Sequence, residues 1–286
     1  MPGSLVLVAT PIGNLEDITL RALRALKEAD LIAAEDTRRT ARLLDHYGIA
    51  TPTTSLHAHN ERGRLPGLLD RIRRGDTIAV VTDAGMPGIS DPGFLAVRHA
   101  LEAGLTVQVV PGVSALTTAI AGAGLPSERI TFLGFAPPRA AERRRWLNRE
   151  RGTPGTLVFF EAPARVAALL RDAADALGNR TAVVARELTK LHESWRRGTL
   201  EELAAAAASG AIPPRGEFVI LLSDLTCGTS EAEEEIAHED VAGAFAALQA
   251  TGSLNRRAAI AEVAERFGIS ARTAYAIIER HKSSVK

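Results

Sequence analysis

The chain is poor in cysteine: Cys227 is the single cysteine among 286 residues. One thiol cannot form an internal disulfide, and no group of cysteine and histidine residues has the spacing of a zinc site. The sequence therefore excludes a disulfide-stapled domain and a zinc module, and it favours a reducing compartment.

Long apolar runs are also missing. The first apolar run, residues 5–9, has neither the basic start nor the length of a secretory signal. No segment approaches the roughly 20 apolar residues that a membrane-spanning helix needs. We expect a cytoplasmic protein that makes no contact with a membrane.

An excess of charge of either sign is absent too. The chain carries 34 basic and 34 acidic side chains, so its formal net charge is zero. Any surface that binds nucleic acid must therefore be local. Hydrophobic residues make up 46% of the chain, as in ordinary globular proteins, and the length favours two or three folding units.

Strand-like and helix-like patterns alternate over the first 121 residues. Strands are expected over 5–9, 30–34, 53–56, 77–82 and 106–110, and helices over 18–27, 37–47, 61–73 and 93–102. This alternation predicts a parallel sheet that helices cover on both faces. Asp91 is expected to cap the helix at 93–102, with Pro92 at its first position.

A second set of the same kind occupies residues 122–225, after a Gly- and Pro-bearing hinge at 122–126. Strands are expected over 130–133, 156–160, 181–185, 193–196 and 217–222, and helices over 140–149, 164–177 and 201–208. The polar segment 187–193 lies between two of these strands and, taken alone, is compatible with a solvated hairpin.

The composition changes after residue 225. Residues 226–238 contain an acidic run and predict a solvated linker. Residues 239–286 predict helices over 240–249, 256–267 and 271–281, with a glycine-containing turn at 268–270 that is typical of a helix-turn-helix. Basic residues outnumber acidic ones from residue 253 onward, which favours nucleic-acid binding over the alternative of a packing or dimerisation module.

Three loops follow strands that a parallel sheet would place side by side, and ligands bind beyond the carboxyl ends of such strands. The loop at 82–93 holds three glycines, two prolines and two aspartates, so a ligand can approach its backbone closely. Asp83 is placed to pair with a cation or to accept a hydrogen bond from a hydroxyl. Ser114 follows the fifth strand and is expected to cap the next helix. The loop at 9–19 lacks the glycine pattern of a dinucleotide or triphosphate site.

Polar side chains also follow the second and third strands. Glu35, Asp36 and Arg38 suit proton handling or phosphate contact, although capping of the next helix is the alternative. His57 and His59 share a spacing that would allow metal binding, but nothing nearby completes a metal site. We therefore favour polar substrate contacts for these two histidines over a metal.

Taken together, these loops resemble the bacterial 16S ribosomal RNA 2′-O-methyltransferases of the tetrapyrrole methylase superfamily. The resemblance rests on VATPIGNLEDITLRA (8–22), AEDTRRT (34–40), SLHAHNE (55–61), TDAGMPGISDPG (82–93), VPGVSAL (110–116), FFEAPARV (159–166), ARELTKLHE (185–193) and GEFVILL (216–222). Residues 12–16 depart from the glycine-rich first loop of true tetrapyrrole methylases, which favours RNA as the substrate.

The resemblance implies two α/β subdomains, at 1–121 and 122–225, with S-adenosylmethionine between them, followed by an RNA-binding helical domain. It implies 2′-O-methylation of a cytidine in the decoding centre of the small ribosomal subunit, by a homodimer without a metal. The implied cofactor-binding residues are Pro11, Asp83, Gly85, Met86, Ser114, Ala115, Phe160, Leu188 and Gly216.

The remaining candidates concern catalysis and the substrate. Glu35 and Asp36 are candidates for the proton acceptor, with Asp17 in reserve, and Arg38 would hold an adjacent phosphate. The expected substrate contacts are Asn14, Asp17, His57, His59, Asn60, Arg256, Arg257 and Arg272. The alternatives are a methyltransferase for a small tetrapyrrole and a metabolite-sensing regulator that binds nucleic acid.

Overall fold

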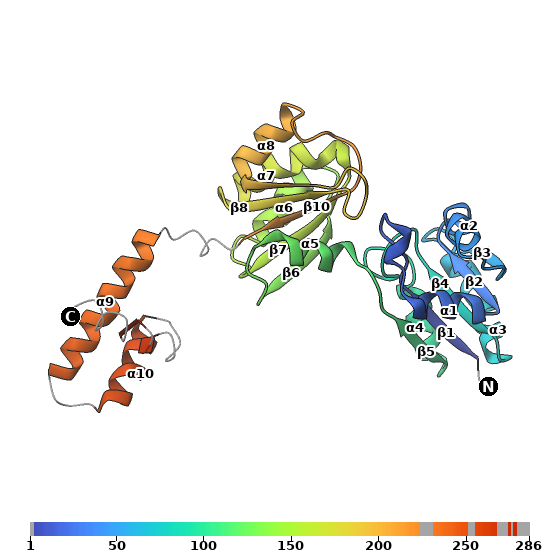
Figure 1. Ribbon diagram of the computed structural model, residues 1–286, viewed down its shortest axis with the longest axis horizontal. Helices are drawn as coiled ribbons and strands as arrows, with labels where there is room; N and C mark the ends of the chain where they lie inside the picture. The colour runs from blue at the N-terminus through green and yellow to red at the C-terminus, as the bar shows by residue number, and fades with distance from the viewer. Residues whose placement is uncertain (1–2, 224–230, 251–254, 268–273, 276, 279–286) are drawn as a thin grey trace. The chain divides into compact units, whose positions relative to one another are not determined.

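A computed structural model describes residues 3–223, 231–250, 255–267, 274–275 and 277–278. The chain divides into two compact units, Met1–Leu225 and Thr226–Lys286 (Figure 1). The first unit contains two five-stranded sheets, and the second is helical.

The first sheet has the strand order β3-β2-β4-β1-β5, and every neighbouring pair is parallel, as predicted. Its strands are β1 (Ser4–Val8), β2 (Leu31–Ala34), β3 (Thr53–Ser55), β4 (Thr77–Val81) and β5 (Thr106–Val110). All five carboxyl ends therefore meet at one edge of the sheet, and the loops with the candidate ligand-binding residues leave it there.

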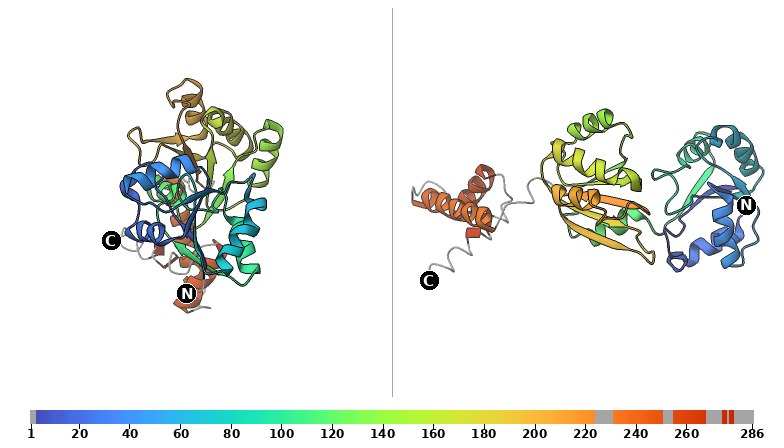
Figure 2. Two further views of the ribbon diagram at one scale, coloured as in Figure 1. Left: turned by 90° about the vertical axis from the view of Figure 1, so that its right-hand side faces the viewer. Right: turned by 90° about the horizontal axis from the view of Figure 1, so that it is seen from above.

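Helices cover both faces of this sheet (Figure 2, right). Because side chains alternate along a strand, Leu5 and Leu7 pack on one face while Val6 and Val8 pack on the other. The first face carries α3 (Glu61–Arg73) and α4 (Phe94–Glu102), and the second carries α1 (Leu20–Glu28) and α2 (Thr37–His46). A short 3₁₀ turn, η1 (Leu15–Asp17), precedes α1 where the sequence predicted continuous helix from residue 18.

The start of α4 differs from its prediction. Its N-cap is Gly93, with φ of +121°, so Asp91 and Pro92 lie before the helix and neither has the predicted capping position. The buried Glu61 of α3 takes over the capping role: its Oε1 accepts hydrogen bonds from Gly93 N and Ala96 N, each at 3.2 Å. A carboxylate from the neighbouring helix α3 therefore replaces the local cap, and the Asp91 carboxylate takes no part in capping α4.

The second sheet is mixed, with the order β6-β7-β10-β8-β9. Its strands are β6 (Ile130–Phe135), β7 (Thr156–Glu161), β8 (Thr181–Arg186), β9 (Ser194–Thr199) and β10 (Phe218–Leu222). Only β6 and β7 pair in parallel, whereas the other neighbours are antiparallel. The polar segment 187–193 joins antiparallel β8 and β9 as a hairpin.

Helices again cover both faces, above and below the second sheet in Figure 1. One face packs against α6 (Ala140–Arg149), α7 (Val166–Leu177), which follows the 3₁₀ turn η2 (Pro163–Arg165), and α8 (Leu200–Ala208). The other face packs against α5 (Ala115–Ala123), through Ala119 and Ala123. The subdomain boundary expected after residue 121 thus falls inside a helix that shares its core with the second sheet.

The second unit has α9 (Glu231–Ala250) and α10 (Arg256–Arg266) around a core that includes Val241, Phe245 and Val263. The linker predicted over 226–238 is wrong for residues 231–238, which belong to α9, because a run rich in Glu and Ala has high helix propensity. The turn predicted at 268–270 and most of the helix predicted at 271–281, Arg272 included, lie outside the described residues.

Candidate active site

The loops that follow β1 and β4 are joined to each other. Thr10 and Gly85 form an isolated antiparallel bridge in which each N–H donates to the other carbonyl at 2.9 Å. The Thr10 hydroxyl adds a 3.0 Å hydrogen bond to the carbonyl of Thr82. These bonds fix the position of the two loops, as the placement of their strands predicted.

The β1 loop also packs against the second sheet. Ile12 is buried in the same apolar cluster as Val158, Leu188 and Val219. A Cβ atom at Gly13 would overlap the side chain of Lys190, so the loop approaches the β8–β9 hairpin as closely as a glycine allows. Loops from the first sheet and side chains from the second therefore face a common space.

That space is a cavity of about 350 Å³, at the lower end of the range for small-molecule sites. It is lined by Ile12, Glu35, Arg39, Asp83, Ala84, Gly85, Met86, Ile89, Ser90, Asp91, Ser114, Ala115, Phe135, Phe160, Glu161, Ala162, Pro163, Leu188, Gly216, Glu217, Phe218 and Val219. Every predicted cofactor-binding residue except Pro11 lies on this wall, and the neighbour of Pro11, Ile12, lies there instead. Of the predicted catalytic residues, Glu35 lines the cavity, but Asp36 and Arg38 do not.

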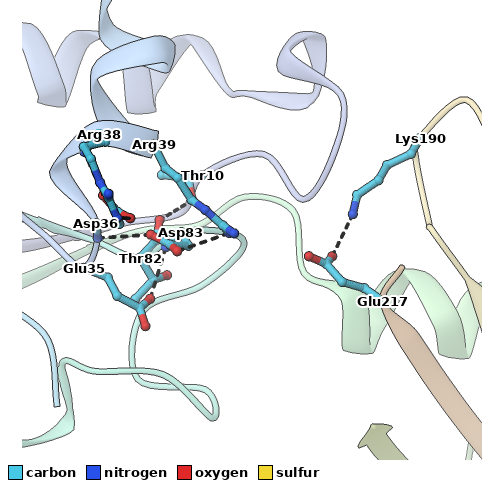
Figure 3. Close-up of polar contacts among 9 residues, drawn as sticks. All are labelled: Thr10, Glu35, Asp36, Arg38, Arg39, Thr82, Asp83, Lys190 and Glu217. Carbon is cyan, nitrogen blue, oxygen red and sulfur yellow. Dashed lines mark hydrogen bonds and ion pairs between the residues drawn. The ribbon is translucent and has the colours of Figure 1, made fainter. Parts of the chain in front are cut away.

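Asp83 is the centre of a polar network at the first-sheet wall (Figure 3). One carboxylate oxygen accepts a hydrogen bond from Asp36 N at 3.1 Å, and the other pairs with Arg39 at 3.2 Å. The Asp83 N–H donates in turn to Oε2 of Glu35 at 3.2 Å. Because most of these bonds involve backbone of the β2 and β4 loops, Asp83 and Glu35 hold the two strand ends together.

Asp36 serves mainly as a helix cap. Its carboxylate accepts from Arg38 N at 2.9 Å and pairs with the Arg38 guanidinium at 2.8 Å. Hydrogen bonds from the Arg38 side chain and backbone hold the Asp36 pKa far below its ordinary range. The geometry shows the alternative role that the sequence allowed for Asp36, which is to cap the next helix. Because its carboxylate already pairs with Arg38, Asp36 has less capacity to take a proton.

Three carboxyl groups that line the cavity, those of Glu35, Asp91 and Glu161, have the opposite behaviour, and burial is the first cause that raises the pKa of each. Burial is the main cause that raises the pKa of Glu35 above its ordinary value, opposed by its hydrogen bond from Asp83. Burial, and then repulsion from Glu35, Asp83 and Glu217, raises the pKa of Asp91 to about 7. The cavity thus concentrates negative charge, with Arg39 as the one cationic side chain among the described residues that line it.

Most of the wall from the second sheet is apolar and aromatic, although Glu161 and Glu217 also belong to it. The Phe160 ring makes edge contacts with Phe132 and Phe135, with ring centroids 4.9 and 5.8 Å apart. Aromatic side chains bury a large area at low conformational cost, so this wall suits a flat, weakly polar part of a ligand.

An ion-paired cluster stands at the edge of the aromatic wall. Lys190 lies 2.9 Å from Glu187. It also lies 3.0 Å from Glu217, and Figure 3 shows this second pair. Gly216 has φ of +87°, and a Cβ atom there would overlap the Glu187 side chain. Glycine at this position therefore lets β10 begin beside the cluster and exposes backbone to the cavity.

Two of the eight residues expected to bind substrate have local roles in the structure. Asn14 caps η1, accepting from Glu16 N at 3.1 Å. Asn60 accepts from His57 N at 2.8 Å and donates to Ser55, which closes the turn before α3. His59 is exposed.

Two of the expected substrate residues keep an unused polar atom. Asp17 Oδ2 and His57 Nδ1 are buried without a hydrogen-bond partner among the described residues. Neither residue is among those that line the cavity, although His57 lies near enough to Glu35 to influence its pKa.

The tail arginines differ among themselves. The Arg256 guanidinium lies over the Tyr275 ring, 5.9 Å from its centroid, and Arg257 is exposed. Arg272 lies outside the described residues, so only the first two have a structural setting.

Sequence reasoning misses several residues of the cavity. Arg39 and Glu217 lie within the motifs at 34–40 and 216–222 but were given no role, and Phe135 lies two residues beyond the predicted end of its strand. The local pattern around Asp91 predicts that its carboxylate caps α4, and so it hides the residue's place in the cavity. The signal that could have found Asp91 is its place in the glycine-rich loop at 82–93, which also holds Asp83.

Neither a metal site nor a membrane span is found in the described part of the chain. No group of three or more His, Cys, Asp or Glu side chains among those residues has the geometry to hold a metal ion. Within the same part, no helix combines the length and apolar character that crossing a membrane requires.

Two α/β sheets with a ligand-sized cavity at the strand ends are typical of an α/β protein that binds a small molecule. The chain belongs to the family of tetrapyrrole (corrin/porphyrin) methylases, whose model matches residues 4–204.

Among curated proteins, the chain is similar to those named ribosomal RNA small subunit methyltransferase I. It is 49% identical over 220 residues to the one from Halalkalibacterium halodurans, covering 77% of this chain and 75% of that protein. It is 42% identical over 274 residues to the one from Escherichia coli O157:H7, covering 96% of this chain and 93% of that protein. The second alignment extends through nearly all of the helical unit.

Among solved structures, the chain resembles uroporphyrin-III C-methyltransferase from Thermus thermophilus complexed with S-adenosyl homocysteine, with a TM-score of 0.55 and 20% identity. The match covers 80% of this chain and 100% of that structure. At this identity the likeness supports the fold, and the fold class predicted from the sequence is confirmed.

Proposed function

We propose that this protein transfers a methyl group from S-adenosylmethionine to RNA of the small ribosomal subunit. The acceptor in this proposal is the ribose 2′-hydroxyl of a cytidine in the decoding centre. The observation that carries the proposal is the acidic and aromatic cavity, in a chain that aligns over 96% of its length with a methyltransferase named for small-subunit ribosomal RNA.

The cavity fits the cofactor in charge. S-adenosylmethionine supplies a methyl group on a positively charged sulfur, which makes the carbon an electrophile without further activation. Glu35, Asp83 and Asp91 offer negative charge at the first-sheet wall, and opposite charges attract strongly where water is partly excluded. These groups favour a cationic sulfonium over neutral ligands of the same shape.

The other parts of the cofactor also find matching groups. Phe160 and Leu188 give an apolar wall for an adenine ring. The Ser114 side chain makes no capping bond at the start of α5, so N–H groups of the first turn remain for an amino-acid carboxylate. Gly85, with φ of +78°, brings bare backbone to the same wall.

The protein's part in methyl transfer is mainly alignment. A methyl group moves in line from sulfur to the attacking oxygen, so the rate depends on how well both partners are held. The Thr10–Gly85 bridge and the Asp83 hydrogen bonds fix the loops that face the ligand.

RNA is favoured over a tetrapyrrole by the extent of the similarity. The alignment with the Escherichia coli protein covers 96% of the chain, whereas the porphyrin methyltransferase structure matches 80%. The helical unit, with Arg256 and Arg257, would supply phosphate contacts that position the RNA without reading its sequence. A ribosomal substrate implies that the protein works in the cytoplasm.

We also propose a homodimer. Strand β5 lies at the edge of the first sheet, and Val109 on it is 53% exposed, with Leu101 of α4 60% exposed nearby in the chain. Exposed edges and apolar side chains of this kind are commonly covered by a partner. Sedimentation at micromolar concentration should give twice the 30.3 kDa chain mass, and a single-chain mass would contradict the dimer.

The test uses full-length protein and cofactor labelled in the methyl group. Small ribosomal subunits that lack the modification should become labelled, whereas a porphyrin precursor should not. Label in the porphyrin alone would contradict the proposal. The variant Arg257→Glu should bind RNA more weakly than the wild type. The salt dependence of its RNA affinity should fall by about one phosphate contact, and its affinity for the cofactor should stay unchanged.

A further inference from the structure

The loop between β4 and α4 carries a carboxylate that the fold does not use. Asp91 is half-buried and lines the cavity. No hydrogen bond or ion pair joins its carboxylate to any other described residue. This loop places Asp91 before α4, where its side chain does not cap the helix.

Each of the other cavity carboxylates accepts at least one hydrogen bond or ion pair, including Glu161, which pairs with Arg165. Glu35 accepts a hydrogen bond from Asp83 N, and both oxygens of Asp83 have partners, Asp36 N and Arg39. Glu217 pairs with Lys190 at 3.0 Å. A carboxylate that already accepts hydrogen bonds or ion pairs has less capacity to take a proton.

The backbone around Asp91 is held firmly. Ser90 has φ of +62°, which is uncommon for a residue other than glycine. The next residues are anchored from α3, because Glu61 accepts from Gly93 N and Ala96 N. Gly88 N also donates to the Pro92 carbonyl at 3.0 Å, which closes the loop on itself. A strained but well-anchored loop at a cavity is typical of a functional position.

We propose that Asp91 is the proton acceptor of the methyl transfer. The inference rests on the proposed function and adds a residue to it. As the ribose hydroxyl oxygen forms its bond to the methyl carbon, the O–H bond breaks and the proton passes to the Asp91 carboxylate. The carbon–sulfur bond breaks with its electron pair remaining on sulfur, which becomes a neutral thioether.

The charges around Asp91 suit this role. Glu35 from the end of β2, Asp83 from the end of β4 and Glu217 from the start of β10 face it as anions, and Arg39 of α2 is the cation of the same wall. Burial and this repulsion raise its pKa to about 7. A base with a pKa near the working pH combines a useful ionised fraction with real proton affinity.

The first test needs no turnover. Carboxyl carbon NMR on the free full-length protein, with the Asp91 signal assigned by its absence in Asp91→Asn, should show titration near neutral pH. A signal that titrates at the ordinary value for aspartate, below about 4.5, would contradict the inference.

The second test compares rates. Asp91→Asn should lower the single-turnover methylation rate of ribosomal subunits by about 100-fold or more. Affinity for S-adenosylhomocysteine, whose sulfur is neutral, should stay within about threefold. Wild-type rates should rise with pH through about 7 and then level off, because the base must be ionised, and the variant should lose that rise.

Controls separate the possible outcomes. Asp45→Asn removes an exposed aspartate of α2 outside the cavity and should leave the rate unchanged. Asp91→Glu should restore part of the rate, and Asp91→Ser replaces the asparagine variant if that variant fails to fold. Product from the wild type with an undiminished Asp91→Asn rate overturns the inference alone. No RNA product from the wild type overturns the proposed function beneath it.

Discussion

The two walls of the cavity differ in what they contribute. Side chains from the first sheet are charged and hydrogen-bonded to backbone at the carboxyl ends of β2 and β4, with Asp83 as their centre. Side chains from the second sheet are mostly apolar, with Phe160 in contact with two other rings. The parallel sheet gathers strand ends at one edge and so concentrates polar loops, whereas the mixed sheet presents a side-chain face. We infer that the first wall recognises charge and the second recognises shape.

Among the variants that test this difference between the walls, Asp83→Asn should change ligand affinity the most. Affinity for S-adenosylmethionine should fall by about 10–100-fold, since an anion that faces a cation and holds two loops is lost. Affinity for S-adenosylhomocysteine should fall less, because its sulfur carries no charge. Calorimetry with both ligands measures this, and an equal loss for both would contradict charge recognition by the first wall.

Phe160→Ala should weaken binding by about tenfold, through lost apolar area and ring contacts. Because the second wall is assigned to shape, the loss should be the same for the charged and the neutral ligand. The same calorimetric pair therefore tests both walls, and a loss confined to the sulfonium ligand would break the comparison.

Gly216→Ala and Gly210→Ala form a matched pair with a smaller effect. Both glycines have positive φ, +87° and +81°, so alanine at either position should cost about 1 kcal/mol of stability. Only at position 216 would the new Cβ overlap Glu187, while open space surrounds position 210. Gly216→Ala should therefore also lower cofactor affinity severalfold, and equal cofactor affinities for the two variants would show that the Glu187–Lys190 cluster does not shape the site.

Asp36→Asn should have the smallest effect. Asparagine caps a helix as well as aspartate does, and the pair with Arg38 is solvent-exposed, so turnover should stay within about threefold of wild type. A loss of about 100-fold would return Asp36 to the position of proton acceptor and contradict the assignment of Asp91.

The sequence was informative about the fold because periodicity reports burial. The alternation of strand-like and helix-like segments over the first 121 residues predicted a parallel sheet covered on both faces, and the structure confirms it. It could not show that Glu61 caps α4, since that bond joins residues 32 positions apart. The local pattern around Asp91 and Pro92 fits a cap, and only the tertiary contact reveals that the cap is supplied from α3.

The candidate site was predictable where a motif ends a strand. Asp83, Met86 and Ser114 were expected at the cavity, and they line it. Charge partners were not predictable in the same way: Asp36 follows β2 as expected, but its carboxylate turns back to Arg38 within its own helix. Which of two neighbouring carboxylates faces a cavity depends on backbone dihedrals that residue types alone do not specify.

The most direct test of the account identifies the methylated nucleoside. Small-subunit RNA should be treated with the full-length protein and S-adenosylmethionine, digested to nucleosides and analysed by mass spectrometry. The account predicts one added methyl group on the ribose of a cytidine. A methyl group on a base, or RNA of unchanged mass beside a methylated tetrapyrrole, would contradict it.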